Sequence, residues 1–310
     1  MFIQNIGELL MVHHIVKYCS VILLITLVGC ASTIERTSKN SSTVVAENNS
    51  DVKLTIQSIP SSYQAFSGSF SKYLSVFGVG IVATDQCDDD KVIHAATIMF
   101  EYLDNNEDGT PDNRVVVDKL VEKKSVLVIG HTQEFFEDFD YDTIEFAGFT
   151  NIQDLYNTEI VLPGTETEQF DATLEEVFHL ITHVGYAHVY PDIFGEKRGS
   201  SIANAMDVAR GGYFETIPTG GPKQGYPSNS WYHYTDDTAD YATQITEYFY
   251  WAMTSYLGVQ ANRFEDIKNE WELNTKEKLQ TGDFAIYNLI TNGTYHLPTV
   301  LPNGSYLVQE

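Results

Sequence analysis

The sequence predicts an α+β fold in which a small N-terminal sheet is followed by a mainly helical C-terminal half. Strands are expected first because short apolar runs rich in β-branched residues lie at 75–83 and 125–130, with a third candidate strand at 159–162. Helices are expected later because the apolar residues from Ala172 onward recur at three- and four-residue spacing. The chain of 310 residues is long enough to bury a sizeable core.

Helical spacing occurs in four segments, which are residues 91–103, 115–123, 172–188 and 240–257. The first two form a helical pair between the first and second predicted strands. In the third segment one face carries the apolar residues Leu174, Val177, Ile181 and Val184. That helix is expected to end before Tyr190 and Pro191, because a proline disfavours helical conformation in the residue before it.

Residues 1–29 have the pattern of a secretory signal peptide. A cationic start precedes an apolar run at 21–28, and the uncharged stretch is too short to cross about 30 Å of hydrocarbon as a helix. Residues 30–52 are rich in Ser, Thr and Asn and lack apolar periodicity, so we expect a flexible tether. Residues 53–310 are expected to form a single globular domain, of one or two lobes, because no second linker or repeat interrupts them.

The predicted signal ends in Leu27-Val28-Gly29-Cys30, which resembles the lipobox of bacterial lipoproteins. The resemblance implies that the thiol of Cys30 is acylated and that the lipid anchor is the protein's only contact with the membrane. Ala31 follows the cysteine, and a residue other than Asp at this place implies release to the outer membrane. We therefore expect a lipid-anchored protein of the bacterial cell envelope. An ordinary cleaved signal with an incidental cysteine is the alternative.

The chain is strongly acidic, with 43 Asp and Glu residues against 18 Lys and Arg and a formal net charge of −25. Residues 1–29 contain one acid and one base, so their removal leaves this charge unchanged. Such a surface repels nucleic acid and anionic membranes, which excludes both as partners, and it attracts divalent cations. Cys19 and Cys30 belong to the signal and its cleavage site, so Cys87 alone remains and no internal disulfide is expected.

The predicted helix over 172–188 carries a group of side chains suited to chemistry. Four of them recur at three- and four-residue spacing within one quadrant of the helix, namely Glu175, Glu176, His179 and His183. Carboxylates and imidazoles stacked a turn apart offer converging lone pairs, which is what a metal ion needs. His188 falls on the apolar side, where we expect a packed core histidine. An amphipathic helix with a solvated Glu and His face is the alternative.

The segment Glu175-Glu176-Val177-Phe178-His179 looks like the H-E-x-x-H helix of the zincin metallopeptidases, with Glu175 in the place of the first histidine. The resemblance implies a zincin-like fold, zinc as cofactor and a peptidase-like hydrolase. Under it, Glu176 is the catalytic general base, His179 is a metal ligand and Glu175 ligates instead of histidine. Alternatively the metal lies one turn along, between His179 and His183, with Glu176 as third ligand or base.

A further ligand is expected from a later helix, as in the gluzincin branch of the family. Residues 246–252 look similar to that helix and place Glu247 in the ligand position. The family's acid one turn later is replaced by Trp251, whereas Asp240 and Thr243 lie on the same helix face as Glu247. The resemblance thus implies that two separate helices converge on a zinc ion, whose bound water becomes a nucleophile near neutral pH.

Residues 104–112 have the D-x-N-x-D-G-x-x-D spacing of a calcium loop between two predicted helices. The expected positions of the oxygen ligands are Asp104, Asn106, Asp108, Thr110 and Asp112. Gly109 allows the sharp turn, and the twelfth position is Val115 instead of a bidentate glutamate, so binding weaker than in an EF-hand is expected. A polar turn that joins two helices is the alternative.

Aromatic residues are dense between positions 226 and 256. Trp231, Tyr234 and Asp240 are candidates for lining a cleft that holds a sugar or an extended peptide, and a core packed around a buried helix is the alternative. Three hypotheses about function follow. The chain is an envelope-anchored, zinc-dependent hydrolase similar to peptidases, a carbohydrate-active or carbohydrate-binding lipoprotein, or a non-catalytic pseudo-peptidase. The expected substrate is accordingly a peptide or a polysaccharide.

Overall fold

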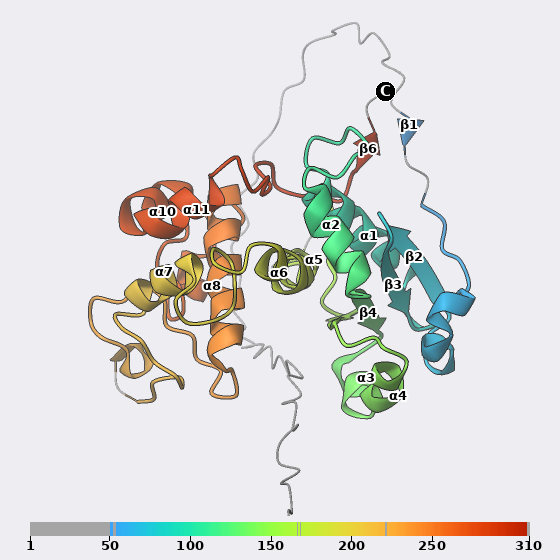
Figure 1. The fold of residues 1–310 in the computed structure, drawn as a ribbon, viewed down its shortest axis with the longest axis horizontal. Coiled ribbons are helices and arrows are strands. Elements are labelled where there is room, and N and C mark those ends of the chain that lie inside the picture. The colour runs from blue at the N-terminus through green and yellow to red at the C-terminus, as the bar shows by residue number, and fades with distance from the viewer. Residues whose placement is uncertain (1–49, 52–53, 166, 168, 221, 309–310) are drawn as a thin grey trace, which may run out of the picture.

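The computed structural model describes residues 50–51, 54–165, 167, 169–220 and 222–308. The predicted signal peptide, Cys30 and nearly all of the predicted tether lie outside these residues. A sheet with its covering helices forms one side of the molecule, and a group of helices around one long helix forms the other (Figure 1). The α+β class that the sequence predicts is therefore confirmed.

The main sheet has four strands in the order β2-β3-β4-β5. Strands β2 (Lys72–Val76) and β3 (Val79–Ala83) are antiparallel, whereas β3, β4 (Val126–Gly130) and β5 (Ile152–Tyr156) are parallel. Every residue of β3 and β4 is buried, as expected for central strands that are covered on both faces. β5 lies at one end of this order, where it packs against the helix that carries the predicted metal ligands.

The apolar run 75–83 is a hairpin and not the single strand that its composition predicts. Phe77 and Gly78 have φ values of 48° and 94°, which reverse the chain between β2 and β3. A two-residue turn that matches the twist of the paired strands requires positive φ at both central residues. Glycine adopts positive φ without strain.

The strand predicted at 125–130 is confirmed as β4, but the strand predicted at 159–162 is wrong. Residues 157–159 form a turn, and the strand that precedes them is β5. Its signal is the alternation of buried Gln153 and Leu155 with half-buried neighbours. The apolar character of the 159–162 run comes instead from packing in the core, where Ile160 is buried without pairing to a strand.

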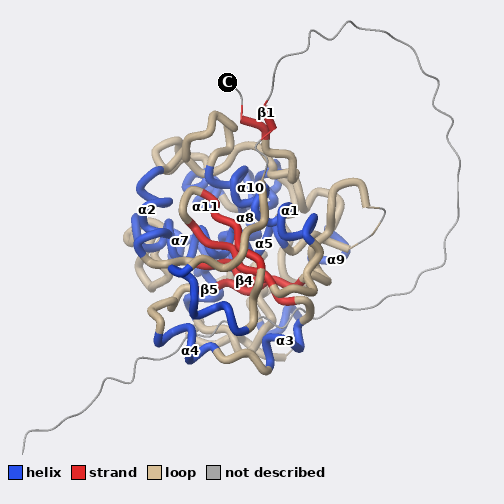
Figure 2. Tube along the Cα trace, turned by 90° about the vertical axis from the view of Figure 1, so that its right-hand side faces the viewer, coloured by secondary structure: helices blue, strands red, loops and turns tan. Residues whose placement is uncertain are grey.

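Helices α1 (Asp89–Leu103) and α2 (Arg114–Glu122) lie between β3 and β4 in the chain and confirm the predicted helical pair. The side chain of Asn113 caps α2 by accepting a hydrogen bond from the backbone N–H of Val116. Three short elements complete this half, namely the 3₁₀ helix Ser61–Gly68, α3 (Gln133–Glu137) and α4 (Tyr141–Phe146). Helices α3 and α4 lie below the sheet in both perpendicular views, where they overlap in Figure 1 and are separated in Figure 2.

The helix predicted over 172–188 is divided into three parts. These are helix α5 (Thr173–Leu180), a π-helical segment (Ile181–Tyr186) and the short helix α6 (Ala187–Val189). The hydroxyl of Thr182 donates to the carbonyl of Phe178 at 2.9 Å, and such bonds bend helices locally. The helix thus changes type two residues after His179.

The second predicted long helix is confirmed as α8 (Tyr241–Leu257). Asp240 caps its start by accepting from the N–H of Thr243 at 2.8 Å, and Gly258 ends it with a φ of 91°. All residues from Gln244 to Ser255 are buried, because other helices pack around α8. Its neighbours are α5, α7 (Ser201–Ala209), α10 (Lys276–Gly282) and α11 (Phe284–Ile290), and the short helix α9 (Phe264–Ile267) follows α8 in the chain.

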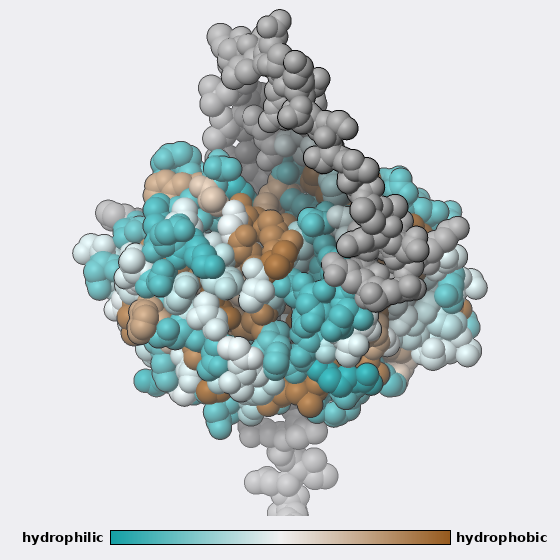
Figure 3. All heavy atoms as spheres, turned by 90° about the horizontal axis from the view of Figure 1, so that it is seen from above, coloured by the Kyte–Doolittle hydropathy of each residue, from teal (hydrophilic) through white to brown (hydrophobic). Residues whose placement is uncertain are grey.

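One large apolar core extends from the sheet through α5 to α8, and a smaller core fills the other face of the sheet. The short strands β1 (Ser50–Asp51) and β6 (Leu307–Val308) pair with each other, so the end of the predicted tether takes part in a strand. None of the helices among the described residues is long and apolar enough to span a bilayer. The face shown in Figure 3 is mainly hydrophilic, with small apolar areas between polar ones.

Gly185 of the π-helical segment provides a test of this packing. A Cβ added at Gly185 would lie 2.7 Å from Cγ1 of Val116 in α2, a stiff β-branched side chain. We therefore expect Gly185→Ala to lower the free energy of unfolding by about 1–3 kcal/mol in urea denaturation. Gly293→Ala is the matched control, since no atom lies within 4 Å of its added Cβ. Equal stability of the two variants would contradict the close approach of α2.

Candidate metal centre

His179 lies where α5 meets α8, and its side chain is 1 % exposed. Its Nε2 is 3.7 Å from Oε1 of Glu247 on α8, and its Nδ1 is 3.6 Å from Oε2 of Glu176 on its own helix. Both glutamates are buried as well. The imidazole therefore lies between two buried carboxylates, one from each helix, and the structure brings together His179 and Glu247 as the sequence predicts.

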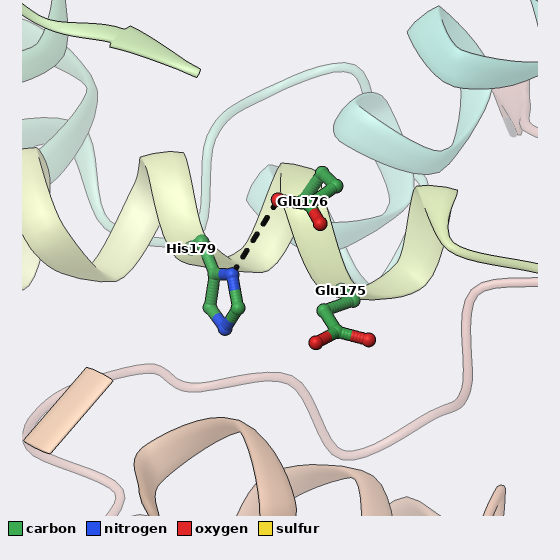
Figure 4. Close-up of side chains that lie close together, drawn as sticks. All are labelled: Glu175, Glu176 and His179. Carbon is green, nitrogen blue, oxygen red and sulfur yellow. Dashed lines mark ion pairs between the residues drawn. The ribbon is translucent and has the colours of Figure 1, made fainter. Parts of the chain in front are cut away.

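Glu175 and His179 point to the same side of α5, whereas Glu176 leaves the helix on another side (Figure 4). Potential ligand atoms of these three residues lie within 4.8 Å of one another. The carboxylate of Glu175 accepts a hydrogen bond from the hydroxyl of Tyr250 on α8. Glu176 accepts one from Nε2 of Gln153 on β5 at 2.6 Å. Each of the two glutamates is thus held by a side chain from another element.

His183 lies apart from this group. Its Nδ1 is 2.5 Å from Oε2 of Glu196, and its side chain is 42 % exposed and lines a separate small pocket. Among the described residues, the group whose potential ligand atoms all lie within 4.8 Å of one another is Glu175, Glu176 and His179. Glu247 is outside this group and adds its 3.7 Å approach to Nε2 of His179. His188 is exposed, so its predicted place in the core is wrong.

A cavity of ≈ 720 Å³ opens beside the candidate ligands. Six acidic side chains line it, namely Glu175, Asp236, Asp237, Glu247, Asp266 and Glu270. Among the described residues of its lining Arg263 is the one base, and Tyr234 and Trp251 contribute aromatic faces. Ligand sites of proteins commonly have volumes of about 300–1,000 Å³. Glu175 and Glu247 therefore border a space that is large enough for a small molecule.

Burial governs the protonation of the site. It raises the pKa of Glu175 to about 7 and, together with repulsion from Glu175, the pKa of Glu270 to about 8. Burial and the neighbouring carboxylate of Glu175 also hold the pKa of Glu176 well above its ordinary value. Burial lowers the pKa of His179 to about 3. The imidazole is therefore neutral near pH 7 and has a lone pair to offer to a metal ion.

The donor atoms fit a divalent transition metal, since zinc accepts neutral imidazole and carboxylate ligands. Two ligand atoms of a tetrahedral zinc site lie about 3.3 Å apart. The 3.7 Å between Nε2 of His179 and Oε1 of Glu247 is close to this value. Glu175 offers a third donor from the side of α5 to which His179 points. The carboxylate of Glu176 faces Nδ1, from where a carboxylate orients a ligating histidine.

The predicted calcium loop is closed by its own carboxylates. The carboxylate of Asp104 accepts hydrogen bonds from the backbone N–H groups of Gly109 at 2.7 Å and Asp108 at 3.2 Å. It also accepts one from the hydroxyl of Tyr306. The side chains of Asn106, Asp108 and Asp112 accept the N–H groups of Asp108, Thr110 and Asn105. All five expected ligand residues lie on one tight turn between α1 and α2. Calcium binding itself stays a prediction.

Of the three residues predicted to line a substrate cleft, Tyr234 borders the cavity. Trp231 donates its Nε1–H to Asp283 at 2.9 Å, and Asp240 is occupied in capping α8. Several other aromatic residues of this region are buried, among them Tyr232, Tyr248 and Tyr250. Most of the aromatic density is therefore core around α8.

Sequence reasoning missed Gln153, Tyr250, Arg263 and Glu270. Gln153 lies on a strand and Glu270 in a turn, without any motif, so that only the fold brings them to the site. Tyr250 had a detectable signal, because it follows Glu247 by three residues on α8 and so lies close to it on the helix surface.

The raised pKa of Glu270 predicts a pH dependence of stability. Its value of about 8 exceeds the ordinary 4.5, so a bound proton stabilises the fold below pH 4.5 and this contribution is lost as the pH rises through about 8. We expect Glu270→Gln to remove that loss and to raise Tm over wild type at about pH 9 but not at about pH 4.5. The exposed Glu277→Gln serves as control. A Tm difference of the same size at both pH values would contradict the assignment.

The calcium loop is tested by titrating Ca²⁺ into the chelator-treated full chain in a calorimeter. We expect calcium to raise Tm and Asp108→Asn to weaken binding by about tenfold, because it removes a charged oxygen ligand. Asp90→Asn, at an exposed position in the first turn of α1, should bind like wild type. Absence of heat and of any Tm change at millimolar calcium would leave the polar turn as the explanation of the motif.

Comparisons with protein-family models, with curated protein sequences and with solved structures found no match to this chain.

Proposed function

We propose that this chain is a metal-dependent hydrolase whose metal ion, zinc in the first instance, is held by Nε2 of His179 and by the carboxylates of Glu247 and Glu175. The observation that carries the proposal is the 3.7 Å approach of His179 to Glu247 from two different helices. Both Glu247 and Glu175 also line the acidic cavity, so the proposed metal is accessible to a substrate. Carboxylates buried this close together need protons or a cation to offset their repulsion, and a divalent ion is the most compact solution.

When bound, zinc supplies a Lewis acid and lowers the pKa of a coordinated water to about 7. The side chains supply orientation and proton transfer. Glu176, which Gln153 holds in place, fixes the ring of His179 from the Nδ1 side. Glu270 lies in the cavity wall with a pKa of about 8, so it carries a proton near neutral pH. A group of this kind can pass a proton to a leaving group.

The resemblance to zincins implies that Glu176 is the general base. We propose a different role for it. Its carboxylate contacts Nδ1 of His179 and the amide of Gln153, and the residues that line the cavity do not include it. A base must reach the water that it deprotonates. We therefore assign Glu176 to positioning and Glu270 to proton transfer.

The proposal extends to the finer fold type and to the cellular location. A zincin-like arrangement is supported by strand β5 beside α5 and by the approach of a glutamate from a later helix. Attachment to the bacterial envelope, at the outer membrane, is supported by the lipobox ending at Cys30. A domain at that location meets the peptides and polysaccharides of the envelope, so the proposed substrates are peptides first and polysaccharides second.

The decisive test is zinc binding by the chelator-treated full chain, measured by calorimetry and by metal analysis. We expect about one ion per chain. His179→Gln and Glu247→Gln should each weaken binding by more than about 100-fold, because they remove ligands, and Glu176→Gln by about 10–100-fold, as for a partner that orients a ligand. His188→Gln is the control, since it removes an exposed histidine from the same helical segment.

Hydrolysis is then assayed on a peptide library and a polysaccharide panel, with zinc present and after chelation. We expect Glu270→Gln to keep zinc and to lose turnover. A wild-type chain without bound transition metal, or a His179 variant with unchanged affinity, would remove the proposal. Zinc binding without any turnover would identify a non-catalytic metal-binding module instead.

A further inference from the structure

A second hydrogen-bonded group joins the same two helical segments at another place. Nδ1 of His183, in the π-helical segment, lies 2.5 Å from Oε2 of Glu196. Oγ1 of Thr246, on α8, donates to Oε1 of the same carboxylate at 2.6 Å. The side chain of Glu196 is 11 % exposed. We call His183, Glu196 and Thr246 the clasp.

The connection that carries Glu196 is itself fixed by packing. Phe194 is buried and stacks on Phe249 of α8, with ring centroids 5.1 Å apart. Gly195 comes next, and a Cβ added there would lie 2.1 Å from the carbonyl oxygen of Pro191, so only glycine fits. These two constraints hold Glu196 between the π-helical segment and α8.

The clasp is adjacent in sequence to the candidate metal centre on both helices. His183 follows His179 by four residues, and Thr246 immediately precedes Glu247. Successive side chains of a helix diverge by about 100°. Thr246 accordingly lines the small pocket with His183, while Glu247 lines the acidic cavity. The clasp thus links α8 to the π-helical segment. The candidate metal centre links α8 to α5.

We propose that the clasp positions the two helices of the metal centre and that it closes fully only while His183 carries a proton. The protonated ring donates to Glu196 in a charge-assisted bond, and Thr246 occupies the other carboxylate oxygen. Loss of the proton leaves a neutral ring and a weaker bond, so that the carboxylate is held mainly by α8. The consequence for metal binding rests on the proposed function, whereas the proton-dependent link between the helices does not.

The charges around His183 favour its protonated form. Burial of the ring lowers its pKa, but Glu196 and Asp240 outweigh burial, so that the pKa lies above the ordinary 6.5. The remaining titratable groups nearby are Asp154, Glu145 and Tyr141 around the pocket, and His179 and His188 on the same helical segment, with Lys123 facing His188. With a raised folded-state pKa, the clasp stabilises the fold below pH 6.5 and this contribution is lost as the pH rises through the folded-state value.

The first measurement is an NMR titration of His183 in the metal-free full chain. We expect a pKa above 6.5 in wild type and a lower value in Glu196→Gln, with no change in the exposed control Glu215→Gln. The Tm deficit of Glu196→Gln should be larger at about pH 6 than at about pH 9. The deficit of the near-isosteric Thr246→Val should be similar at both, because the bond from Thr246 does not involve the proton of His183. An unchanged pKa in Glu196→Gln, or a Glu196→Gln deficit that does not depend on pH, overturns the clasp.

The second measurement is zinc affinity at the same two pH values. If the clasp positions the centre, Glu196→Gln and Thr246→Val bind zinc about tenfold more weakly than wild type at about pH 6. At about pH 9 the difference shrinks for Glu196→Gln but persists for Thr246→Val. Equal affinities, or a Glu196→Gln ratio independent of pH, overturn the positioning role. A wild-type chain that binds no zinc overturns the proposed function instead, and the titration and stability data then decide on the clasp alone.

Discussion

The burial of several carboxylates around one imidazole is the constraint on which the site depends. Removing an ionised carboxylate from water costs several kcal/mol unless opposite charge or a proton compensates. Helices α5 and α8 nevertheless bury Glu176 and Glu247 on either side of His179, with Glu175 beside them. Arg263 acts against the rise in the pKa of Glu175, but burial outweighs it. Protonation of the carboxylates would relieve this repulsion, but protonated carboxyl groups are poor metal ligands. A divalent ion would relieve the repulsion and bind the carboxylates as ligands.

The two histidines of this stretch have different partners. His179, in α5, approaches Glu247 of α8, whereas His183, in the π-helical segment, bonds to Glu196. Glu196 in turn accepts from Thr246 of α8. On the π-helical segment itself Gly185 lets α2 approach closely. The proposed metal site and the proposed clasp therefore use different residues of one short stretch.

Helical periodicity was sufficient to predict α1, α2 and α8. The approach of Glu247 to His179 was expected only from the resemblance to a family, since periodicity does not say which helices meet. Strand boundaries were harder. The chain reverses direction at Phe77 and Gly78. This turn lies within a single apolar run, because the strands on both sides of it have buried residues. Strand β5 has a polar residue on its buried face, Gln153, whose burial is explained by the bond to Glu176. Contacts of this kind join residues far apart in the chain and leave no periodic signal.

In the proposed metal site, Glu175 stands where the motif that this segment resembles has its first histidine. Glu175 and His179 are four residues apart and point to one side of α5, as two ligands on one helix must. Compared with that motif, the direction of the proposed ligand is kept and its charge is changed. If ionised Glu175 and Glu247 hold a metal, their two negative charges would balance a divalent ion, and a set richer in oxygen would shift preference toward metals that favour carboxylates. More anionic donors would also lower the Lewis acidity of such an ion. A proton-carrying group such as Glu270 in the cavity wall then matters more, which ties the acidity of the cavity to the identity of the ligands.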